Sequence, residues 1–429
     1  MTTGFTIDGS SDLEARLERT CDEVLAGVRA LVPASKLEAL VLGGGYGRGQ
    51  GGVLKTPSGD QPYNDLEFYV FLRGNRVWNE RRFQPPLAVL GEQLSPEAGL
   101  HVEFKVDSLA RFRRSPVSMF SYDLVSRHRV LWTGFRTPGG LFAGCRHHVD
   151  AGRIPAVEGT RLLFNRCSGL LLAKEMLKAG SLAGEQADFV GRNISKAQLA
   201  LGDSVLAACG RYHWSCLERR NRLALLLAEA ASAAPEGVDP DALLRHHAAG
   251  VEFKLHPWRA KPATGLPEAR LKSGSRREEA LTSPENPEEI RDSSPRLLPN
   301  RQLFDLPAAH REVSELASRV WLWLESRRLD RRFATAREYA FSPVKKCAGA
   351  PAWRNLLLNL RSLRGAALLD PMALRYPRGR LLNTLPLLLW EDPASDPKAT
   401  RHLQRQLQTV ASDWQALVAA YKNLWPSFS

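Results

Sequence analysis

The sequence has no apolar run of the roughly 20 residues that a membrane-spanning helix requires. Its most apolar stretch, residues 381–390, is shorter and contains Asn383 and Pro386. The chain begins with Met1-Thr2-Thr3 and an acidic segment, whereas a secretion signal has a basic segment followed by an apolar one. We therefore expect no membrane partner and a cytoplasmic location.

Cysteine is also scarce, and its placement argues against a zinc site. None of the six cysteines forms a Cys-x-x-Cys pair or is followed by histidine at a zinc-ligand spacing. This pattern indicates free thiols in a reducing compartment.

Acidic residues are the minority among the charged side chains. The chain has 46 Asp and Glu against 59 Lys and Arg, which gives a net charge of +13. Such an excess suits a polyanionic partner, such as nucleic acid or a nucleoside triphosphate. The densest basic cluster is only Arg111-Phe112-Arg113-Arg114, however, and scattered arginines are typical of solvated helix faces. The charge therefore gives weak support for a phosphate-bearing substrate.

Apolar periodicity predicts strands only in the N-terminal part of the chain. Ser11-Asp12-Leu13-Glu14 has the spacing of a capping box with Ser11 as N-cap, which predicts a helix over 11–31. Strands are predicted at 37–42, 63–72, 100–106 and 129–132, with a glycine-rich loop up to residue 59 and a helical stretch around 86–94.

The remainder of the chain has the pattern of helices. Apolar residues recur at helical spacing over 162–177, 194–209, 223–231, 307–329, 352–369 and 400–424. Between 258 and 301 the composition changes to Pro, Ser, Glu, Arg and Lys, which predicts a flexible linker or insertion. We therefore predict an α+β protein with a small mixed sheet and flanking helices in residues 1–150. A helical domain at 151–257, the linker and a C-terminal helical region at 302–429 follow.

Two carboxylates are expected to point in the same direction from the second strand. Asp65 and Glu67 are two residues apart, so their side chains share one face of the strand, while Leu66 and Phe68 face the core. Neighbouring carboxylates repel each other unless a cation lies between them. Their hard oxygen atoms suit Mg²⁺, with Mn²⁺ as an alternative, and Mg²⁺ commonly binds one or two carboxylates together with substrate phosphates.

A third carboxylate on the neighbouring strand would complete a site for two metal ions that promotes in-line phosphoryl transfer. Glu103 suits this role because it lies on the polar face of the strand at 100–106. Asp107 lies on the same face and is its rival.

The segment before these acids is rich in glycine and reads Leu42-Gly43-Gly44-Gly45-Tyr46-Gly47-Arg48-Gly49. Residues without a Cβ let the backbone approach a ligand closely, and successive N–H groups form an anion-binding nest. The segment also contains a dinucleotide fingerprint, but the glycines and Pro57 that follow forbid the helix this motif needs. A near match to a P-loop is weak, because Leu54 occupies the place of its second glycine and Pro57 follows it.

A strand ending in a glycine pair, a short turn, and Asp-x-Asp/Glu on the next strand resemble the signature of the DNA polymerase β nucleotidyltransferase superfamily. By this resemblance, Gly44 and Gly45 match the Gly-Ser pair that contacts the triphosphate. Asp65, Glu67 and Glu103 match the three metal-binding acids. The chain departs from the pattern in three ways: Gly45 replaces serine, Glu67 replaces the commoner aspartate, and the interval between the loop and Asp65 is longer.

The resemblance is carried by the N-terminal part alone, where residues 120–124 and 130–134 also resemble the closing strands of bacterial members. It implies transfer of a nucleoside monophosphate from a nucleoside triphosphate to an acceptor, with release of pyrophosphate. The catalytic, metal-binding residues would be Asp65, Glu67 and Glu103, and the nucleotide-binding residues would be Gly44, Gly45 and Arg48. Arg48 equally suits a cap of the turn.

The acceptor is not identified by the sequence and would be a protein, an RNA or a small molecule. Two alternatives stay open. The first is a non-catalytic module of the same fold that binds a nucleotide or a partner, which the unusual Gly45 and Glu67 favour. The second is a nucleic-acid-binding protein that uses its basic surface.

Overall fold

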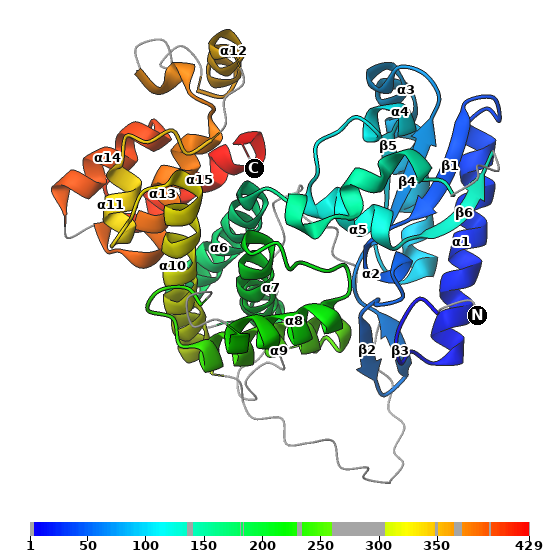
Figure 1. Cartoon of the computed structure of the whole chain (residues 1–429), viewed down its shortest axis with the longest axis horizontal. Helices are drawn as coiled ribbons and strands as arrows, with labels where there is room; N and C mark the ends of the chain where they lie inside the picture. Colours follow the sequence, from blue (N-terminus) through cyan, green and yellow to red (C-terminus); the bar gives the residue numbers. More distant parts are fainter. Residues whose placement is uncertain are drawn as a thin grey trace.

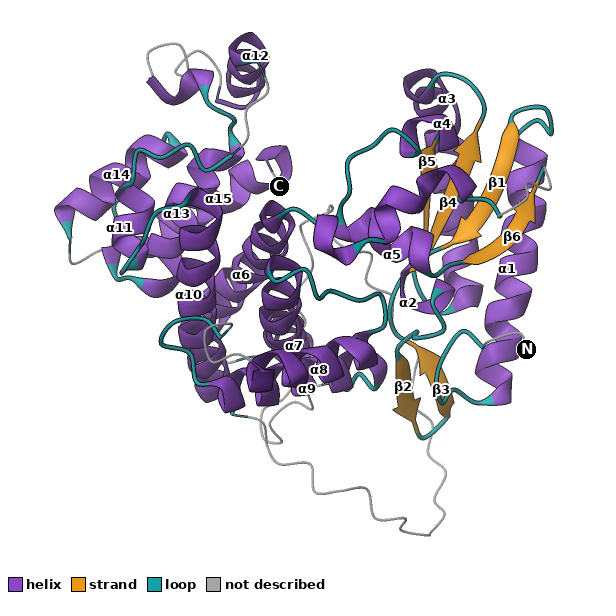
Figure 2. Ribbon diagram, in the orientation of Figure 1, coloured by secondary structure: helices purple, strands orange, loops and turns teal. Residues whose placement is uncertain are grey.

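The computed structural model describes residues 4–134, 140–180, 182, 184–229, 234–259, 305–347, 351–363, 371–393 and 396–428. In these residues the chain is an α+β protein, with a small mixed sheet near its N-terminus and helices in the remainder (Figure 1, Figure 2). No helix in these ranges is both long and apolar enough to cross a membrane. All six cysteines are free thiols, as predicted. Apart from residues 258 and 259, the predicted linker lies outside the described residues.

The main sheet has four strands in the order β5-β4-β1-β6. β4 and β5 run parallel, while β1 is antiparallel to both β4 and β6. The strand at 63–72 begins later than predicted, because the N–H of Tyr63 bonds to the hydroxyl of Tyr46 instead of to a neighbouring strand. The strands are β1 Leu37–Leu42, β4 Leu66–Leu72, β5 Val102–Asp107 and β6 Arg129–Thr133.

Different helices cover the two faces of the sheet, and Figure 1 shows α1 and α5 on opposite sides of it. Even-numbered side chains of β4, such as Phe68, pack in a core with α1 and α3, while odd-numbered ones, such as Phe71, pack with α4 and α5. Glu67 is odd-numbered and therefore projects on the side of α5. The helices of this half are α1 Ser11–Leu31, α2 Gly44–Gly47, α3 Arg76–Ala98, α4 Leu109–Phe112 and α5 Met119–Ser126, followed by the 3-10 segments Ala143–Val149 and Ala151–Arg153.

The glycine-rich segment contains more secondary structure than the continuous loop that the sequence predicted. Its start forms the short helix α2, and its end forms a hairpin of β2 (Val53–Thr56) and β3 (Gly59–Pro62). The hairpin was missed because its strands are short and contain glycine and proline, which are depleted in strands. Gly59 has a φ of +114°, so its lack of a side chain permits the turn.

The N-terminal cap of α1 was assigned to the wrong residue. Ser10, not Ser11, is the N-cap, and its hydroxyl accepts a hydrogen bond from the N–H of Leu13 at 3.4 Å. The carboxylate of Glu14 instead accepts the N–H groups of Phe5 and Thr6. Glu14 therefore fixes the extended segment before the helix and does not complete a capping box.

One further prediction in this half was wrong. Residues 120–124 belong to helix α5, whose first turn has a capping box of Ser118 and Ser121, and are not a closing strand. The helix predicted around 86–94 is confirmed, and it is longer than predicted, since α3 continues through Pro85, Pro86 and Pro96 although proline usually ends a helix.

The remainder of the described chain is helical, and the helices predicted at 162–177, 194–209, 223–231 and 307–329 are confirmed as α6, α7, α8 and α10. The predicted helix over 400–424 is two helices, since Gln408 has a φ of +53° and ends the first. Helix α13 was not predicted because it is buried on all sides and lacks a polar face. The helices are α6 Ala156–Lys178, α7 Gly184–Ala208, α8 Cys216–Glu229, α9 Pro240–Leu255, α10 Leu306–Leu329, α11 Ala336–Phe341, α12 Ala352–Leu363, α13 Arg378–Trp390, α14 Pro397–Leu407 and α15 Trp414–Phe428, with the 3-10 segment Pro371–Leu374.

One apolar core joins the helices before and after the predicted linker. Leu170 on α6 and Leu201 on α7 belong to the same buried cluster as Trp321 on α10 and Leu385 on α13. These helices therefore pack as a continuous body in the described structure.

The glycine-rich segment lies against this helical body. Gln50 donates to the hydroxyl of Ser215 at 2.7 Å and accepts the N–H of Cys216, at the start of α8, at 2.9 Å. Nearby, Nε2 of His256 lies 3.0 Å from a carboxylate oxygen of Asp8. Both halves of the chain therefore border the region where the candidate residues lie.

Candidate functional site

Gly44 begins helix α2 and lies directly beside the side chain of Glu67. Its φ is +61°, a conformation that favours glycine, and a Cβ there would lie 3.3 Å from Oε2 of Glu67. The N–H of the preceding Gly43 donates to the backbone carbonyl of Glu67 at 2.9 Å. The predicted glycine loop and one predicted carboxylate are thus in contact.

Gly45 has a local steric reason to differ from the serine of the polymerase β pattern. A Cβ at this position would lie 3.0 Å from the backbone carbonyl oxygen of Gln50, closer than ordinary van der Waals contact. The N–H of Gln50 in turn donates to the carbonyl of Gly45 at 2.8 Å, which holds the two segments together. The tight turn favours glycine at this position.

Tyr46 anchors the glycine loop and was missed by the sequence analysis. Its ring is fully buried, and its hydroxyl donates to the carbonyl of Gly52 at 2.8 Å and accepts the N–H of Tyr63 at 2.9 Å. Burial raises the pKa of this hydroxyl far above its usual value, and the charge of nearby Asp65 raises the pKa further. Tyr46 therefore ties the glycine loop to the segment that carries Asp65. An aromatic residue among glycines was the only signal of this role.

The structure brings Glu67 and Glu103 together and separates Asp107 from them. Glu67 and Glu103 are paired in register on the parallel strands β4 and β5, whereas Asp107 is paired with Phe71. Four strand residues span about 13 Å, so Asp107 lies at the far end of β5. There its carboxylate bonds to Arg111. Glu103 is thus the better placed of the two candidates for a third carboxylate.

Asp65 stands immediately before β4, not within it. Its side chain is exposed, whereas the side chain of Glu67, two residues further along the chain and within β4, is half-buried. Asp65 is close enough to the buried hydroxyl of Tyr46 to influence its pKa. The residue is therefore at the solvent-facing edge of the site, on the segment that Tyr46 holds.

Lys105 is the neighbour of both strand carboxylates. Its Nζ lies 3.1 Å from Oε2 of Glu103 and 3.9 Å from Oε1 of Glu67. The hydroxyl of Tyr69, opposite Lys105 in register, donates to Oε2 of Glu67 at 3.0 Å. Burial and the charge of Glu67 raise the pKa of this hydroxyl well above its usual value, so it stays a donor. Lys105 follows Glu103 by two residues, so both side chains lie on one face of the strand. This spacing was the sequence pattern from which the role of Lys105 could have been predicted.

Arg48 follows the end of α2 and forms an ion pair with a residue of α5. Its Nη1 lies 3.2 Å from Oδ2 of Asp123, and both side chains are largely buried. The Nε of Arg48 and Oδ1 of Asp123 are buried and make no hydrogen bond within the described structure. Burial raises the pKa of Asp123, although Arg48 and Arg219 oppose this effect. Arg48 therefore caps the turn and keeps one guanidinium donor unused.

Lys254, at the end of α9, brings a second cation to the glycine loop. Its backbone carbonyl would lie 2.9 Å from a Cβ at Gly52, so helix and loop are in close contact. Burial, followed by the charge of Arg48, lowers the pKa of the half-buried Lys254 to about 8. No sequence pattern pointed to Lys254, because the loop and α9 are far apart in the chain.

A chain of buried polar contacts continues from Asp123 into the helical body. The hydroxyl of Tyr212 lies 3.4 Å from Oδ2 of Asp123 and accepts a hydrogen bond from Arg219 at 3.1 Å. Nε of Arg219 lies 2.7 Å from Oδ1 of Asp203, which His247 also contacts at 3.0 Å. Burial opposes ionisation of Asp203, but Arg219 and His247 outweigh it and lower its pKa. This network fixes the orientation of the glycine loop relative to α7, α8 and α9.

Comparison with protein-family models, curated proteins and solved structures found no match.

The donor set of the site suits a hard divalent cation only in part. Glu67 and the exposed Asp65 supply carboxylate oxygens beside backbone N–H groups at the start of α2, which have no partner within that helix. In the described ranges, however, no three His, Cys, Asp or Glu side chains converge as a metal cluster. The carboxylate of Glu103 is directed at Lys105 instead. Asp65 and Glu67 would therefore be the residues that hold Mg²⁺.

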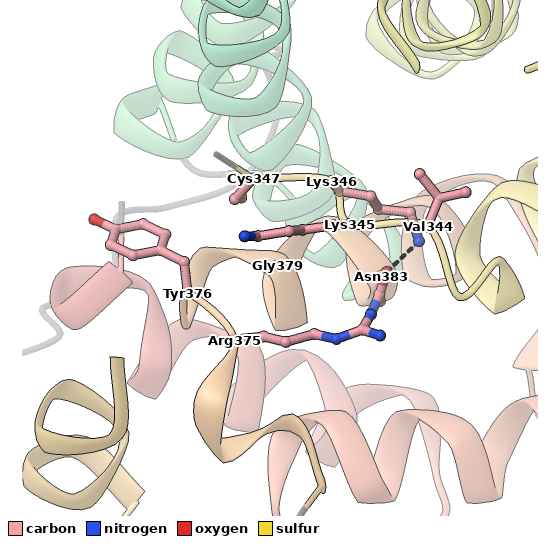
Figure 3. A pocket seen from close by; sticks show the side chains of 8 residues that line it. All are labelled: Val344, Lys345, Lys346, Cys347, Arg375, Tyr376, Gly379 and Asn383. Atoms are coloured by element: carbon pink, nitrogen blue, oxygen red, sulfur yellow. Dashed lines mark hydrogen bonds between the residues drawn. The ribbon is translucent and has the colours of Figure 1, made fainter. Parts of the chain in front are cut away.

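A separate pocket lies between helices of the C-terminal region and is not part of this site (Figure 3). Its most buried cation is Lys346, whose ammonium group donates to Asn383 and to the carbonyls of Ala340 and Ser342. Burial lowers the pKa of Lys346 to about 7. Because these three acceptors use the donors of Lys346, its role is structural. The lining residues are Val344, Lys345, Lys346, Cys347, Arg375, Tyr376, Gly379 and Asn383.

Proposed function

We propose that the chain is a nucleotidyltransferase that transfers a nucleoside monophosphate from a nucleoside triphosphate to an acceptor. The observation that carries the proposal is that Gly44 lies beside the carboxylate of Glu67, with Glu103 next to Glu67 on the adjacent parallel strand. The loop would bind phosphate and the neighbouring carboxylates would bind a metal ion. This is the juxtaposition that the resemblance to the polymerase β superfamily implies.

The triphosphate would lie along the glycine loop. Backbone N–H groups of Gly44 and Gly45 would donate to its oxygen atoms, because the start of a helix leaves these groups without partners. Arg48 follows the other end of α2, and Lys254 is close enough to Arg48 for the charge of Arg48 to influence its pKa, so both would add positive charge near the phosphates. Binding would then use residues from both halves of the chain.

In the reaction, an oxygen of the acceptor attacks the α-phosphorus while the bond from this phosphorus to the oxygen bridging to the β-phosphorus breaks. Pyrophosphate leaves, and Glu103 would accept the proton of the acceptor. Mg²⁺, when bound, supplies charge neutralisation to the phosphates. Asp65, Glu67 and the loop contribute mainly by positioning the nucleotide and by favourable electrostatics. The acceptor would be a protein, an RNA or a small molecule.

The test is Mg²⁺-dependent transfer of label from each of the four α-³²P-labelled nucleoside triphosphates to a total cell extract and to the protein itself. Wild-type protein should transfer label, and Asp65→Asn with Glu67→Gln should abolish transfer while leaving the protein folded. Asp107→Asn is the matched control, because this carboxylate lies on the same strand face but at its far end. Transfer that persists in the double variant would contradict the proposal.

The alternative of a non-catalytic binding module is favoured by one observation. Glu103 is engaged by Lys105, which leaves fewer carboxylates for a metal than a two-metal enzyme uses. Under this alternative, calorimetry would detect binding of a nucleoside triphosphate to wild-type protein, and no label would be transferred to any fraction of the extract.

A further inference from the structure

Lys105 occupies the space between the two carboxylates that the neighbouring strands bring into register. Its ammonium group is 3.1 Å from Glu103 and 3.9 Å from Glu67. In a two-metal site the two cations stand about 3.5–4 Å apart and share the carboxylates between them. The ammonium group therefore supplies a positive charge beside two neighbouring carboxylates, as a metal ion would in such a site.

The surroundings of Lys105 differ from those of an isolated ion pair on a strand surface. Nζ also lies 5.7 Å from the centre of the Tyr69 ring, and the hydroxyl of Tyr69 is bonded to Glu67. Lys105, Tyr69, Glu67 and Glu103 thus form one connected group across β4 and β5. Without Lys105, the side-by-side carboxylates of Glu67 and Glu103 would repel each other.

We propose that Lys105 is a built-in cation of the candidate site, so that the protein binds a single divalent ion at Asp65 and Glu67. This inference rests on the proposed function. Glu103 would be held by Lys105 as a proton acceptor and would not be a metal ligand. Mg²⁺ would complete its coordination with substrate phosphates and water, as it does where only one or two carboxylates are supplied.

Electrostatics gives the expected size of the effect. A divalent ion bound beside an ammonium group is repelled by its charge, which we expect to lower the affinity for the ion roughly tenfold. Lys105 is 43% exposed, so the solvent-screened value applies. Removal of its charge should therefore strengthen binding of divalent cations by roughly tenfold or more, and should open a second site at Glu103.

The experiment counts Mn²⁺ ions bound to the full-length chain by electron paramagnetic resonance and calorimetry, without nucleotide. Wild-type protein should bind one Mn²⁺, and Lys105→Met should bind a second Mn²⁺ or bind the first roughly tenfold more tightly. Lys105→Arg retains the charge and should behave as wild type. Lys36→Met removes an exposed lysine outside this group of residues and controls for the change in net charge. Urea unfolding of each variant shows whether it is folded.

Two outcomes separate failure of this inference from failure of the proposed function. If wild-type protein binds two Mn²⁺, or if Lys105→Met changes neither the number nor the affinity of the bound ions, the role of Lys105 is refuted while the metal site stands. If wild-type protein binds no Mn²⁺, or if Asp65→Asn does not weaken binding, the proposed metal site fails and the inference falls with it.

Discussion

Replacement of Lys254 by methionine should make the protein more stable and a weaker binder of nucleotides. Lys254 is half-buried at the end of α9 beside the glycine loop. Burial and then Arg48 lower its pKa from the ordinary 10.5 to about 8. At pH 7 the side chain is therefore charged in a place that disfavours its charge, and Lys254→Met removes this cost while keeping a similar length.

The expected gain in stability follows from the lowered pKa of Lys254. This pKa shift corresponds to an upper limit of about 3 kcal/mol, and contact with solvent at a half-buried site reduces the gain. We expect Lys254→Met to raise the free energy of unfolding at pH 7 by about 1–2 kcal/mol. Between pH 8 and 10.5 the unfolded state of the wild type binds more protons than the folded state, so wild-type stability rises with pH. The advantage of the variant should therefore shrink over this window and vanish above it.

The assay is urea unfolding followed by tryptophan fluorescence at pH 7, 8, 9 and 10, with Lys36→Met as the control for an exposed lysine. Calorimetry with a nucleoside triphosphate at pH 7 should show roughly tenfold weaker binding for Lys254→Met, because one charge-assisted contact to phosphate is lost. A destabilised variant at pH 7, or a gain that does not change with pH, would refute the reasoning about the buried charge. Unchanged nucleotide affinity would refute only the phosphate contact.

Three further variants test the loop and its support. Gly44→Ala should weaken nucleotide binding measured by calorimetry and cost about 1 kcal/mol of stability, because alanine is strained at a φ of +61°. Tyr46→Phe should lower the free energy of unfolding by about 1–3 kcal/mol in urea titrations, because the buried carbonyl of Gly52 loses its donor. Arg219→Met should cost about 3–5 kcal/mol, since Asp203 would stay buried beside a single histidine; a loss under 1 kcal/mol would contradict this network.

The sequence predicted the sheet well because its signal is local. Short apolar stretches located β1, β4 and β6, alternation of apolar and polar residues located β5, and the strand period of two placed Glu67 and Phe68 on opposite faces. The choice between Glu103 and Asp107 needed the register of β4 against β5, which depends on how two separate segments pair. Register is not contained in the spacing of either strand alone.

Contacts between distant segments explain most of what the sequence did not predict. Arg48 pairs with Asp123 on α5, and Lys254 reaches the glycine loop from α9. No periodicity relates such residues, since their proximity arises only after the helical body packs on the sheet. The hairpin at Val53–Thr56 and Gly59–Pro62 was missed for a different reason, because its composition is that of a loop.

The buried network carries more positive than negative charge. Arg48, Lys254 and Arg219 face the two carboxylates of Asp123 and Asp203, and the surplus cation is Lys254, beside the glycine loop. Burial of an uncompensated charge is unfavourable unless a counter-charge arrives. An anion is therefore the ligand that this side of the loop would favour.

The opposite end of helix α2 would favour a ligand of the opposite charge. Glu67 lies beside Gly44, and Asp65 precedes it on the same edge of the sheet. Lys105 balances only one of the carboxylates of Asp65, Glu67 and Glu103, so this side would still favour a cation. A free anion spanning the loop would be repelled by these carboxylates. A metal ion alone would leave the positive charges of Arg48 and Lys254 without a counter-charge. A polyphosphate that carries its own divalent cation would satisfy both ends of the four-residue helix at once. Under the proposed function we therefore expect a metal–nucleotide complex to bind more tightly than either component alone, and titration of nucleotide with and without Mg²⁺ should show binding that is tighter when both are present.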